Sequence, residues 1–422
     1  MNYLFLHRRC PGPFAAIAQT LAARPGNTVC FLAEHICQED ASGPAFGRVQ
    51  TGIVLVPGVG AAVDSMEKEA LAHVRRSESF ALGMRELHER GFAPDVVCHE
   101  ADAGVAHFAR EIFPHALLVC RAEWFDTPVR PAPLSAPSAP SGPSSAPPVP
   151  VSLESLDLSG AAKVRDQYRL SALTACDRAY TASQWQRSRF PQELQARMAV
   201  IPDAVDTVRF APLMMPKLPL CPDEYPHLDR AEEIITYACR EFSAVRCFDE
   251  LCAALAPVLR ERPGCHAVLM GADAPCDASP DQAFATWRET VQQKYPLPEG
   301  RVHFTGYCPT ALYTRLLQAS SLHVHLTRPY TLSRSLIEAL GTGCLVLASG
   351  APQVLEAVTP GENGLILSQD AQDHPERVYA AIMNALDLAP TRLSLRETAR
   401  KRALAGRSLR SGLTPLLHLL KP

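Results

Sequence analysis

The chain has 422 residues, of which 47% are hydrophobic and 20% are charged, and its formal net charge is −3 at pH 7. This length exceeds a single ordinary core and predicts two domains, while the composition is typical of a folded globular protein. A net charge so close to zero excludes a global attraction to nucleic acid or to an anionic membrane. No apolar run approaches the ~20 residues that cross a bilayer.

Short apolar runs alternate with helical patterns in the first third of the chain. The runs YLFL, TVCFL, GIVLV, DVVCH and ALLVC predict strands, and helices are expected at residues 14–23 and 66–90. The first run is too short, and its charges follow it, so it does not form a signal peptide. Strands that alternate with helices predict a parallel sheet covered by helices on both faces.

Residues 128–150 break this alternation, because nine of these 23 residues are proline. Proline at this density excludes a helix or a central strand and predicts a polyproline-rich insert. Two interpretations remain open, namely a passive surface loop and a lid or docking segment beside an active site.

The alternation resumes after the insert. CDRAYTAS predicts a strand, SQWQRSRF a short helix and MAVIP a further strand. A second proline-rich stretch at residues 212–226 predicts the linker between domains. The second half then predicts strands at IITYAC, HAVLMGA, RVHFTGY, LHVHLT, LVLAS and GLIL, and helices at residues 248–260 and at SLIEAL. The predicted domains are residues 1–211 and 227–398, followed by a helix at 399–422 that we expect to pack back on the first domain.

The fourteen cysteines are scattered, without any C-x-x-C, and several lie in apolar runs. This pattern indicates buried, reduced thiols in a cytoplasmic protein rather than a disulfide framework or a zinc site. The C-terminal segment is rich in arginine. Its basic residues form either a solvated helix face or a surface that contacts anionic lipid at the membrane periphery.

Two arginines follow the predicted strand IITYAC. Arg240 stands at the end of that strand, and Arg246 follows six residues later, close to the start of a helix. Ligands of open parallel sheets bind at the carboxyl ends of strands. Two forked guanidinium groups there are suited to hold a diphosphate, although a pair of surface arginines fits the spacing equally well.

Glu338 lies in the apolar helix SLIEAL, ahead of Gly341 and Gly343. A carboxylate in such surroundings needs partners, which are either the hydroxyls of a ribose or groups within the protein. Residues 331–335 precede this helix and offer backbone N–H groups to an anion. No G-x-G-x-x-G follows the first strand, which disfavours a dinucleotide-dependent dehydrogenase.

Taken together, these segments resemble glycosyltransferase family 4. The resemblance rests on the order R-x5-R, SLIEALGTGCLVLAS and APxxxExxxxGENGLIL in the second half. In the first half, LFLHRRCPGPF, RGFAPDVVCHE, LLVCRAEWF, TASQWQRSRFP and VIPDAVDTVRF resemble a bacterial subgroup. The resemblance implies an α/β GT-B architecture, in which two Rossmann-like domains face a central cleft.

The resemblance also implies a donor site in the second domain. Arg240 and Arg246 match the basic pair that binds the donor diphosphate, although Cys247 stands where the family often has glycine. Glu338 matches the second acid of the E-x7-E motif, which binds the nucleotide ribose. Tyr330 stands in place of the first acid, which would contact the donor sugar.

Three further positions complete the implied donor side. The amides of Ser333 and Arg334 would meet the phosphates, at places where the family usually has glycine. Gly12, between two prolines in the first loop, matches a glycine near the same phosphates.

Two candidates for catalysis come from the first domain. His99 matches a histidine that points into the cleft near the donor sugar and the acceptor, although a histidine after a strand is also often structural. Glu123 matches a glutamate on the acceptor side. Asp203 and Asp206 match aspartates that shape the segment between the domains.

The resemblance therefore implies a retaining glycosyltransferase that moves a sugar from a nucleotide-diphosphate sugar to a glycan, lipid-linked or protein acceptor. It implies no nucleic-acid partner, no cofactor and no metal, since the arginines and helix-end amides would stabilise the leaving group. The alternatives are a non-catalytic GT-B subunit that binds glycan or a partner transferase, and a GT-B nucleotide-sugar epimerase.

Overall fold

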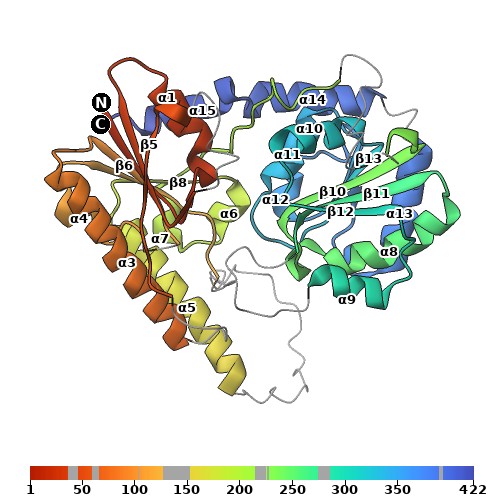
Figure 1. Ribbon diagram of the computed structural model, residues 1–422, viewed down its shortest axis with the longest axis horizontal. Helices are drawn as coiled ribbons and strands as arrows, with labels where there is room; N and C mark the ends of the chain where they lie inside the picture. Colours follow the sequence, from red (N-terminus) through yellow and green to blue (C-terminus); the bar gives the residue numbers. More distant parts are fainter. Residues whose placement is uncertain are drawn as a thin grey trace, which may run out of the picture.

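The computed structural model describes residues 1–36, 46–58, 66–102, 104–126, 153–213, 225, 228–273, 286–388 and 393–422. The proline-rich insert predicted at 128–150 lies outside these residues, as does most of the stretch at 212–226. Two α/β halves lie next to each other in the described chain (Figure 1).

The N-terminal half is built on a seven-stranded parallel sheet in the order β5-β3-β1-β6-β7-β8-β9. Its strands are β1 (Asn2–Leu6), β3 (Thr28–Ala33), β5 (Gln50–Ile53), β6 (Val96–Glu100), β7 (Leu117–Arg121), β8 (Arg178–Thr181) and β9 (Met198–Val200). A small separate pair joins β2 (Arg9–Cys10) to β4 (His35–Ile36). The central strands are buried along their length, which follows from their apolar composition.

Helices cover both faces of this sheet. The helical segments are η1 (Gly12–Phe14), α1 (Ala15–Ala22), η2 (Phe46–Arg48), α3 (Met66–Glu89), α4 (Ala109–Ile112), α5 (Leu153–Ala175), α6 (Gln184–Ser188) and α7 (Gln192–Gln195). The long helices α3 and α5 lie side by side on one face, and α1 lies on the other (Figure 1). Helix α5 was not among the predicted elements.

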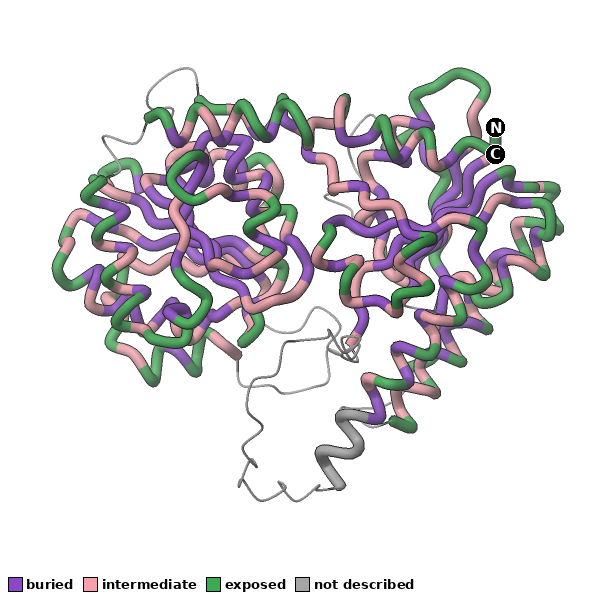
Figure 2. The backbone as a smooth tube through the Cα atoms, turned by 180° about the vertical axis from the view of Figure 1, so that it is seen from behind, coloured by how far each residue is buried: buried purple, intermediate pink, exposed green. Residues whose placement is uncertain are grey.

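The C-terminal half contains a six-stranded parallel sheet in the order β12-β11-β10-β13-β14-β15. Its strands are β10 (Glu233–Glu241), β11 (Cys265–Ala272), β12 (Val302–Gly306), β13 (Leu322–His325), β14 (Val346–Ser349) and β15 (Leu365–Leu367). The helical segments are η3 (Leu228–Arg230), η4 (Ala244–Arg246), α8 (Phe248–Glu261), α9 (Trp287–Lys294), α10 (Thr310–Ala319), α11 (Arg334–Gly341), α12 (Pro352–Leu355), η5 (Ala371–Asp373) and α13 (Pro375–Leu388). One buried cluster joins α8 and α13 to the sheet, and a second joins α10 and α11 to its other face (Figure 2).

The C-terminal segment consists of two helices, α14 (Leu393–Arg407) and α15 (Leu409–Leu419), which span both halves (Figure 1). Helix α14 packs against α11, whereas α15 packs against α1 and buries Leu413 and Leu416 in the N-terminal core. The boundary predicted at 398/399 falls inside α14, because the chain crosses to the N-terminal half only at Ser408, the N-cap of α15.

Most arginines that made this segment basic are engaged with the protein. Arg396 Nε donates to Gly343 O (2.6 Å), and Arg400 Nη1 donates to Gly341 O (2.9 Å). The carbonyls after α11 thus receive the partners that a helix end lacks. Arg402 pairs with Glu362. These contacts favour the interpretation of a folded helix face over that of a lipid-binding surface.

Both sheets reverse their strand order at one point. In the N-terminal sheet, β1 and β6 are neighbours although the chain first runs outward from β1 through β3 and β5. In the C-terminal sheet the corresponding neighbours are β10 and β13. At such a switch point the loops leave in opposite directions and open a crevice at the carboxyl ends of the strands, which is where ligands bind.

The carboxyl edges of the two sheets face each other. The segment after β7 reaches the segment after β13, where the rings of Trp124 and Tyr330 lie 4.8 Å apart. The segment after β8 reaches the segment after β14, where Gln184 N donates to Glu356 (2.9 Å). The two switch points therefore open toward the same space between the halves.

The start of α8 depends on a buried aromatic stack. Phe248 is fully buried, and its ring lies 4.0 Å from that of Phe242, with the planes almost parallel. This stack supports the connection from β10 to α8, which carries Arg246.

We expect Phe248→Ala to lower the free energy of unfolding by about 3–5 kcal/mol, because it leaves a cavity in the core. Urea unfolding followed by circular dichroism measures this loss. The exposed Leu393→Ala is the matched control and should change stability by less than about 0.5 kcal/mol. An equal effect of the two substitutions would contradict the importance of the stack.

Candidate active site

A buried guanidinium organises the N-terminal side of the site. Arg121 ends β7 with a side chain only 4% exposed, and it pairs with Glu100 (3.2 Å), Glu123 (3.3 Å) and Asp203 (3.1 Å). Glu100 is the last residue of β6, whereas Glu123 follows β7 and Asp203 follows β9. The ends of three strands thus bring these carboxylates to one cation. Burying a charge is costly unless it is paired, and three carboxylates satisfy this requirement.

His7 extends the same network from the end of β1. Its Nε2 lies 2.7 Å from Glu100, and its Nδ1 lies 2.6 Å from the backbone oxygen of Arg9. Burial alone would lower the pKa of His7, but the adjacent Glu100 carboxylate outweighs it and raises the pKa above the usual value. Gly12 packs on this ring at a φ of +48°, where a Cβ would lie 2.6 Å from Nδ1. The glycine is therefore required to seat His7, and its contact with the donor phosphates stays a prediction.

Glu123 is the carboxylate of this network that opens toward the space between the halves, with a side chain 36% exposed. Burial of its surroundings raises its pKa to about 7, and the nearby charges of Glu100, Asp102 and Asp203 act in the same direction, whereas Arg121 opposes them. A carboxyl group with such a pKa changes its protonation state near neutral pH, as general acids and bases do.

A second arginine, Arg169, holds the wall beside Glu123. Arg169 on α5 pairs with Asp102, Asp126 and Asp166, each at 2.8–2.9 Å. Because α5 supplies this arginine, the helix that the sequence analysis did not predict fixes two loops of the site.

His99 lies near the end of β6 and is buried. Its side chain is 2% exposed, and it lines a small cavity beneath α5 together with Tyr168 and Leu118. Burial lowers the pKa of His99 to about 4, so the imidazole is neutral at physiological pH. A packed, neutral histidine matches the structural alternative, and a contact of His99 with the donor sugar or the acceptor stays a prediction.

The donor side begins at the end of β10. Arg246 ends η4, and its Nη1 donates to Thr327 Oγ1 (2.9 Å), in the segment after β13. Arg246 thus joins the two strands of the switch point. Arg240 also leaves β10 here; its side chain is 62% exposed, and its charge lies 3.7 Å from that of Glu241.

Cys247 takes a left-handed conformation, with a φ of +51°. This backbone conformation costs an L-residue roughly 1–2 kcal/mol and is free for glycine. The family's preference for glycine after the second basic residue therefore has a steric origin that remains in this chain.

Helix α11 opens beside Arg246. Its N-cap, Ser333, makes no side-chain capping hydrogen bond, and its hydroxyl contacts that of Ser335 instead (2.7 Å). The first backbone N–H groups of a helix have no intrahelical partner. Arg334 is the exposed first residue of the helix, so Ser333 and Arg334 lie where the resemblance expects phosphate contacts.

Glu338 lies on α11, one turn further on, and is half-buried. The hydroxyl of Tyr313, on α10, donates to its Oε2 (2.8 Å). The carboxylate therefore has a partner within the protein, which was one of the two alternatives.

Tyr330 faces the N-terminal half across the site. Its ring meets that of Trp124 at an interplanar angle of 59°. Burial raises the pKa of Tyr330 to about 12, and the charges of Glu123 and Asp102 add to this rise. The position that lacks the acid of the family motif is thus occupied by a neutral phenol beside the acidic wall of the other half.

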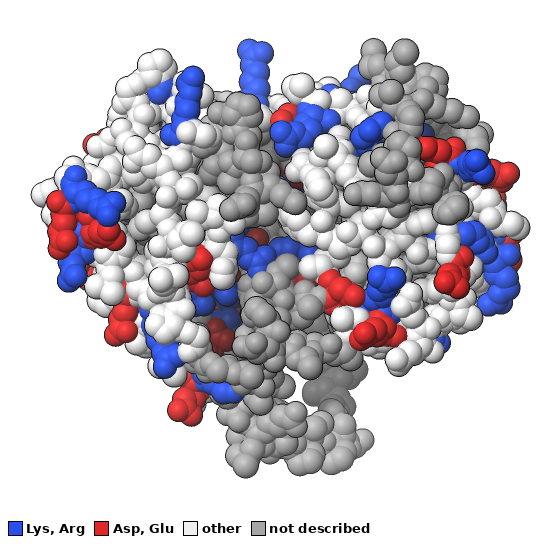
Figure 3. Space-filling model, viewed as in Figure 1, with Lys and Arg blue, Asp and Glu red and all other residues white. Residues whose placement is uncertain are grey.

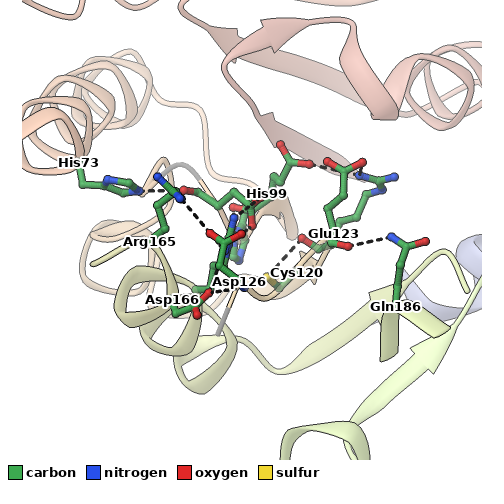
Figure 4. A network of polar contacts seen from close by, with 12 residues as sticks. His73, His99, Cys120, Glu123, Asp126, Arg165, Asp166 and Gln186 are labelled. Atoms are coloured by element: carbon green, nitrogen blue, oxygen red, sulfur yellow. Dashed lines mark hydrogen bonds and ion pairs between the residues drawn. The ribbon is translucent and has the colours of Figure 1, made fainter. Parts of the chain in front are cut away.

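Gln186 and Glu356 were not among the predicted site residues. Gln186 Nε2 donates to Glu123 O (2.8 Å) (Figure 4), and its Oε1 accepts from Leu332 N in the opposite half (3.4 Å). The carboxylate of Glu356 accepts the N–H groups of Gln184 and Trp185. Both lie in quoted motifs, but no sequence pattern indicates a contact between distant loops.

Family models match both halves of this geometry. The model of the glycosyl transferase family 4 group matches residues 55–210, which contain strands β6 to β9 and Glu123. The model of glycosyl transferases group 1 matches residues 232–387, which include Arg246 and Glu338. The chain is a glycosyltransferase of the family 4 type.

Solved glycosyltransferase structures share its fold over the whole chain. Anabaena HepE in complex with UDP and glucose has a TM-score of 0.70 and 15% identity, covering 100% of this chain and 99% of its own. Sucrose-phosphate synthase from Thermosynechococcus elongatus has a TM-score of 0.70 and 16% identity, covering 99% and 98%. WaaG, a glycosyltransferase involved in lipopolysaccharide biosynthesis, has a TM-score of 0.64 and 16% identity, covering 98% of each chain. The comparison with curated proteins finds no match. The GT-B architecture predicted from sequence is confirmed.

Further properties of this glycosyltransferase follow from its described residues. None of their helices has the length and hydropathy of a membrane span. No three His, Cys, Asp or Glu side chains among them are grouped as metal ligands are. The cysteines that the structure describes are all free thiols. Acidic and basic side chains are interspersed over the described surface in Figure 3.

We expect transfer activity to fall as the pH falls through about 7, because protonated Glu123 lacks the negative charge that strengthens a hydrogen bond from an acceptor hydroxyl. A pH profile of kcat/KM measures this acidic limb. Glu123→Gln should lower activity and remove the limb, since an amide does not titrate in this range. A limb that persists unchanged in the variant would assign it to another group.

The raised pKa has a consequence for stability as well. The folded state holds the proton of Glu123 more tightly than the unfolded state, so this group costs stability as the pH rises from its unfolded pKa to about 7. Glu123→Gln should therefore raise the melting temperature at pH 8 but have little effect at pH 4. Equal melting temperatures at pH 8 would contradict the raised pKa.

Proposed function

We propose that this glycosyltransferase moves a sugar from a nucleotide-diphosphate sugar to a glycan, lipid-linked or protein acceptor in the cytoplasm, with retention of the anomeric configuration. The observation that carries the proposal is the opposition of two unlike surfaces. A cationic strand switch point with an uncapped helix end faces a carboxylate-rich switch point across the Trp124–Tyr330 contact.

The C-terminal half binds the donor in this proposal. Arg240 and Arg246 are placed to hold the diphosphate, and the first amides of α11, at Ser333 and Arg334, add uncharged donors to its oxygens. As the bond to the sugar breaks, negative charge develops on the same diphosphate, and these groups stabilise it. Cations of the chain thus do the work that a metal ion does in other transferases.

Glu338 is the ribose ligand of the proposal. A carboxylate accepts hydrogen bonds from two neighbouring hydroxyls, and the Tyr313 hydroxyl keeps Glu338 oriented through one oxygen. The ordering of Glu338 before the donor arrives lowers the entropy that binding costs.

The N-terminal half binds the acceptor. Glu123 is the group that we place against the acceptor hydroxyl, because its carboxylate opens toward the opposite half and titrates near neutral pH. Tyr330 supplies a ring edge and a hydroxyl to the donor sugar in place of an acid. In a retaining front-face reaction the leaving diphosphate takes the proton of the acceptor, so no stronger protein base is required.

The similar structures support the choice of donor. HepE is described in complex with UDP-glucose, as well as with UDP and glucose. A UDP-sugar is therefore the first donor class to test on this chain. A thermal-shift screen with nucleotide sugars identifies the donor, since a ligand of the folded state raises its melting temperature.

We expect Arg246→Ala to reduce kcat/KM at least about a hundredfold, because removal of a charged group from the transition state costs about 3 kcal/mol or more. Arg240→Ala should act in the same direction and also weaken the thermal shift by the donor. Arg260→Ala, on the exposed side of α8, is the matched control and should change neither quantity. Full activity of both site variants would contradict the proposed donor site.

A further inference from the structure

Glu356 binds the backbone of the opposite half. It follows α12 in the C-terminal half, and its Oε2 and Oε1 accept the N–H groups of Gln184 (2.9 Å) and Trp185 (2.6 Å) in the N-terminal half. These are the first two residues of α6, whose own cap, Ser183, serves the N–H of Gln186. A single carboxylate thus supplies the two acceptors that the start of this short helix lacks.

Helix α6 carries Gln186, whose side chain is 1% exposed. Both ends of its amide are used: Nε2 holds the backbone carbonyl of Glu123, and Oε1 receives Leu332 N from the segment between Tyr330 and α11. One side chain therefore connects the residue that we place against the acceptor with the segment that we place against the donor.

A second contact path runs parallel to the first. The Arg189 guanidinium lies 5.4 Å from the ring of Trp185 and 5.7 Å from that of Trp124. Trp124 in turn meets Tyr330. Hence the backbone N–H of Trp185 is held by Glu356, while its ring is coupled through Arg189 to the aromatic contact between the halves.

The Glu356 contact is suited to form and break. Glu356 is exposed, so water is available to its carboxylate whenever the halves separate. Arg407 lies near both Glu356 and Asp203 of the N-terminal half; burial lowers its pKa, and these two carboxylates oppose that effect. Positive charge between the two halves favours the arrangement in which both carboxylates approach.

We propose that Glu356 is a positioning residue of the active site, which fixes α6 when the halves close and, through Gln186, sets Glu123 and the segment before α11 in register. This inference rests on the proposed function, and it adds a residue that touches neither substrate. In the proposed function the C-terminal half binds the donor. The loss of Glu356 should therefore lower kcat more than the affinity for the donor.

Glu356→Gln tests the proposal, because the amide keeps the shape but can accept only through one oxygen and carries no charge. We expect kcat to fall about tenfold, in line with the loss of one charge-assisted hydrogen bond, while KM for the donor stays within about twofold. Small-angle scattering should show a larger radius of gyration than for the wild type. Glu356→Asp should recover part of the activity.

Glu362→Gln is the matched control. Glu362 lies six residues further along the same segment and pairs with Arg402 within the C-terminal half. It should leave kcat and the radius of gyration unchanged. If Glu356→Gln behaves like this control while the wild type transfers sugar, the positioning role is refuted.

Gln186→Met tests the route from α6 to the site. Methionine keeps the buried volume and removes these two hydrogen bonds, together with the one that Ser183 Oγ donates to Gln186 Oε1 (3.0 Å). If Glu356 acts through Gln186, the variant that combines Glu356→Gln and Gln186→Met should have about the same kcat as the slower of the two single variants. A kcat lowered by the product of the two single effects would refute the shared route. Melting temperatures of all variants identify loss of folding.

The scattering comparison does not require transfer. If the wild type transferred no sugar from any nucleotide sugar, the proposed function would fail, yet the difference in radius between the wild type and Glu356→Gln would still decide whether Glu356 holds the halves together.

Discussion

Two parallel sheets with opposed carboxyl edges are the constraint on which the rest of the molecule depends. Each sheet buries its strands between helices, so polar side chains that must reach solvent or substrate gather at the strand ends. Because each sheet has one switch point, each has one place where loops diverge and leave a crevice. The chain crosses between the halves just before Phe210, which packs in the C-terminal core, and crosses back at Ser408. These two crossings bring the two crevices together.

The two sides of the site satisfy their charges differently. On the N-terminal side, buried arginines collect more carboxylates than they can neutralise, and Glu123 is the member of this excess that remains accessible. Its pKa is raised first by burial and then by the charges of these neighbouring carboxylates, against the effect of Arg121. On the C-terminal side, the described cations Arg240 and Arg246 lie at the mouth of the site. An anionic leaving group is therefore favoured on one side only, which gives the cleft its polarity.

Several contacts between the halves in the described part of the chain are made by residues of the site itself. Tyr330, Leu332, Gln186 and Glu356 meet across the cleft through a ring contact and single hydrogen bonds. Such contacts are weak enough to exchange with water and specific enough to define one closed arrangement. Closure excludes water from the reaction, so the same residues that hold the halves together also protect the donor from hydrolysis.

The sequence by itself determined the fold class and the positions of nearly all strands, and it predicted the donor-side residues. Local periodicity defines a strand, and Arg240, Arg246 and Glu338 belong to contiguous motifs whose spacing is set by one strand, one loop and one helix. The sequence also determined that residue 330 lacks an acid. These features depend on neighbours within about 20 residues along the chain, so pattern and resemblance were sufficient to find them.

Only the tertiary structure decided what depends on distant segments. The burial of His99 follows from its packing beneath α5, and the pKa of Glu123 is raised first by burial and then by the charges of carboxylates more than 20 residues away on either side. Arg396 and Arg400 of the basic C-terminal segment make internal contacts, since they reach the end of α11 and the turn after it. Glu356 is separated from Trp185 by 171 residues along the chain. Folding brings its carboxylate within hydrogen-bonding distance of Trp185 N, and this proximity lets Glu356 cap α6. Burial and long-range charge are properties of the packed molecule, and no local pattern encodes them.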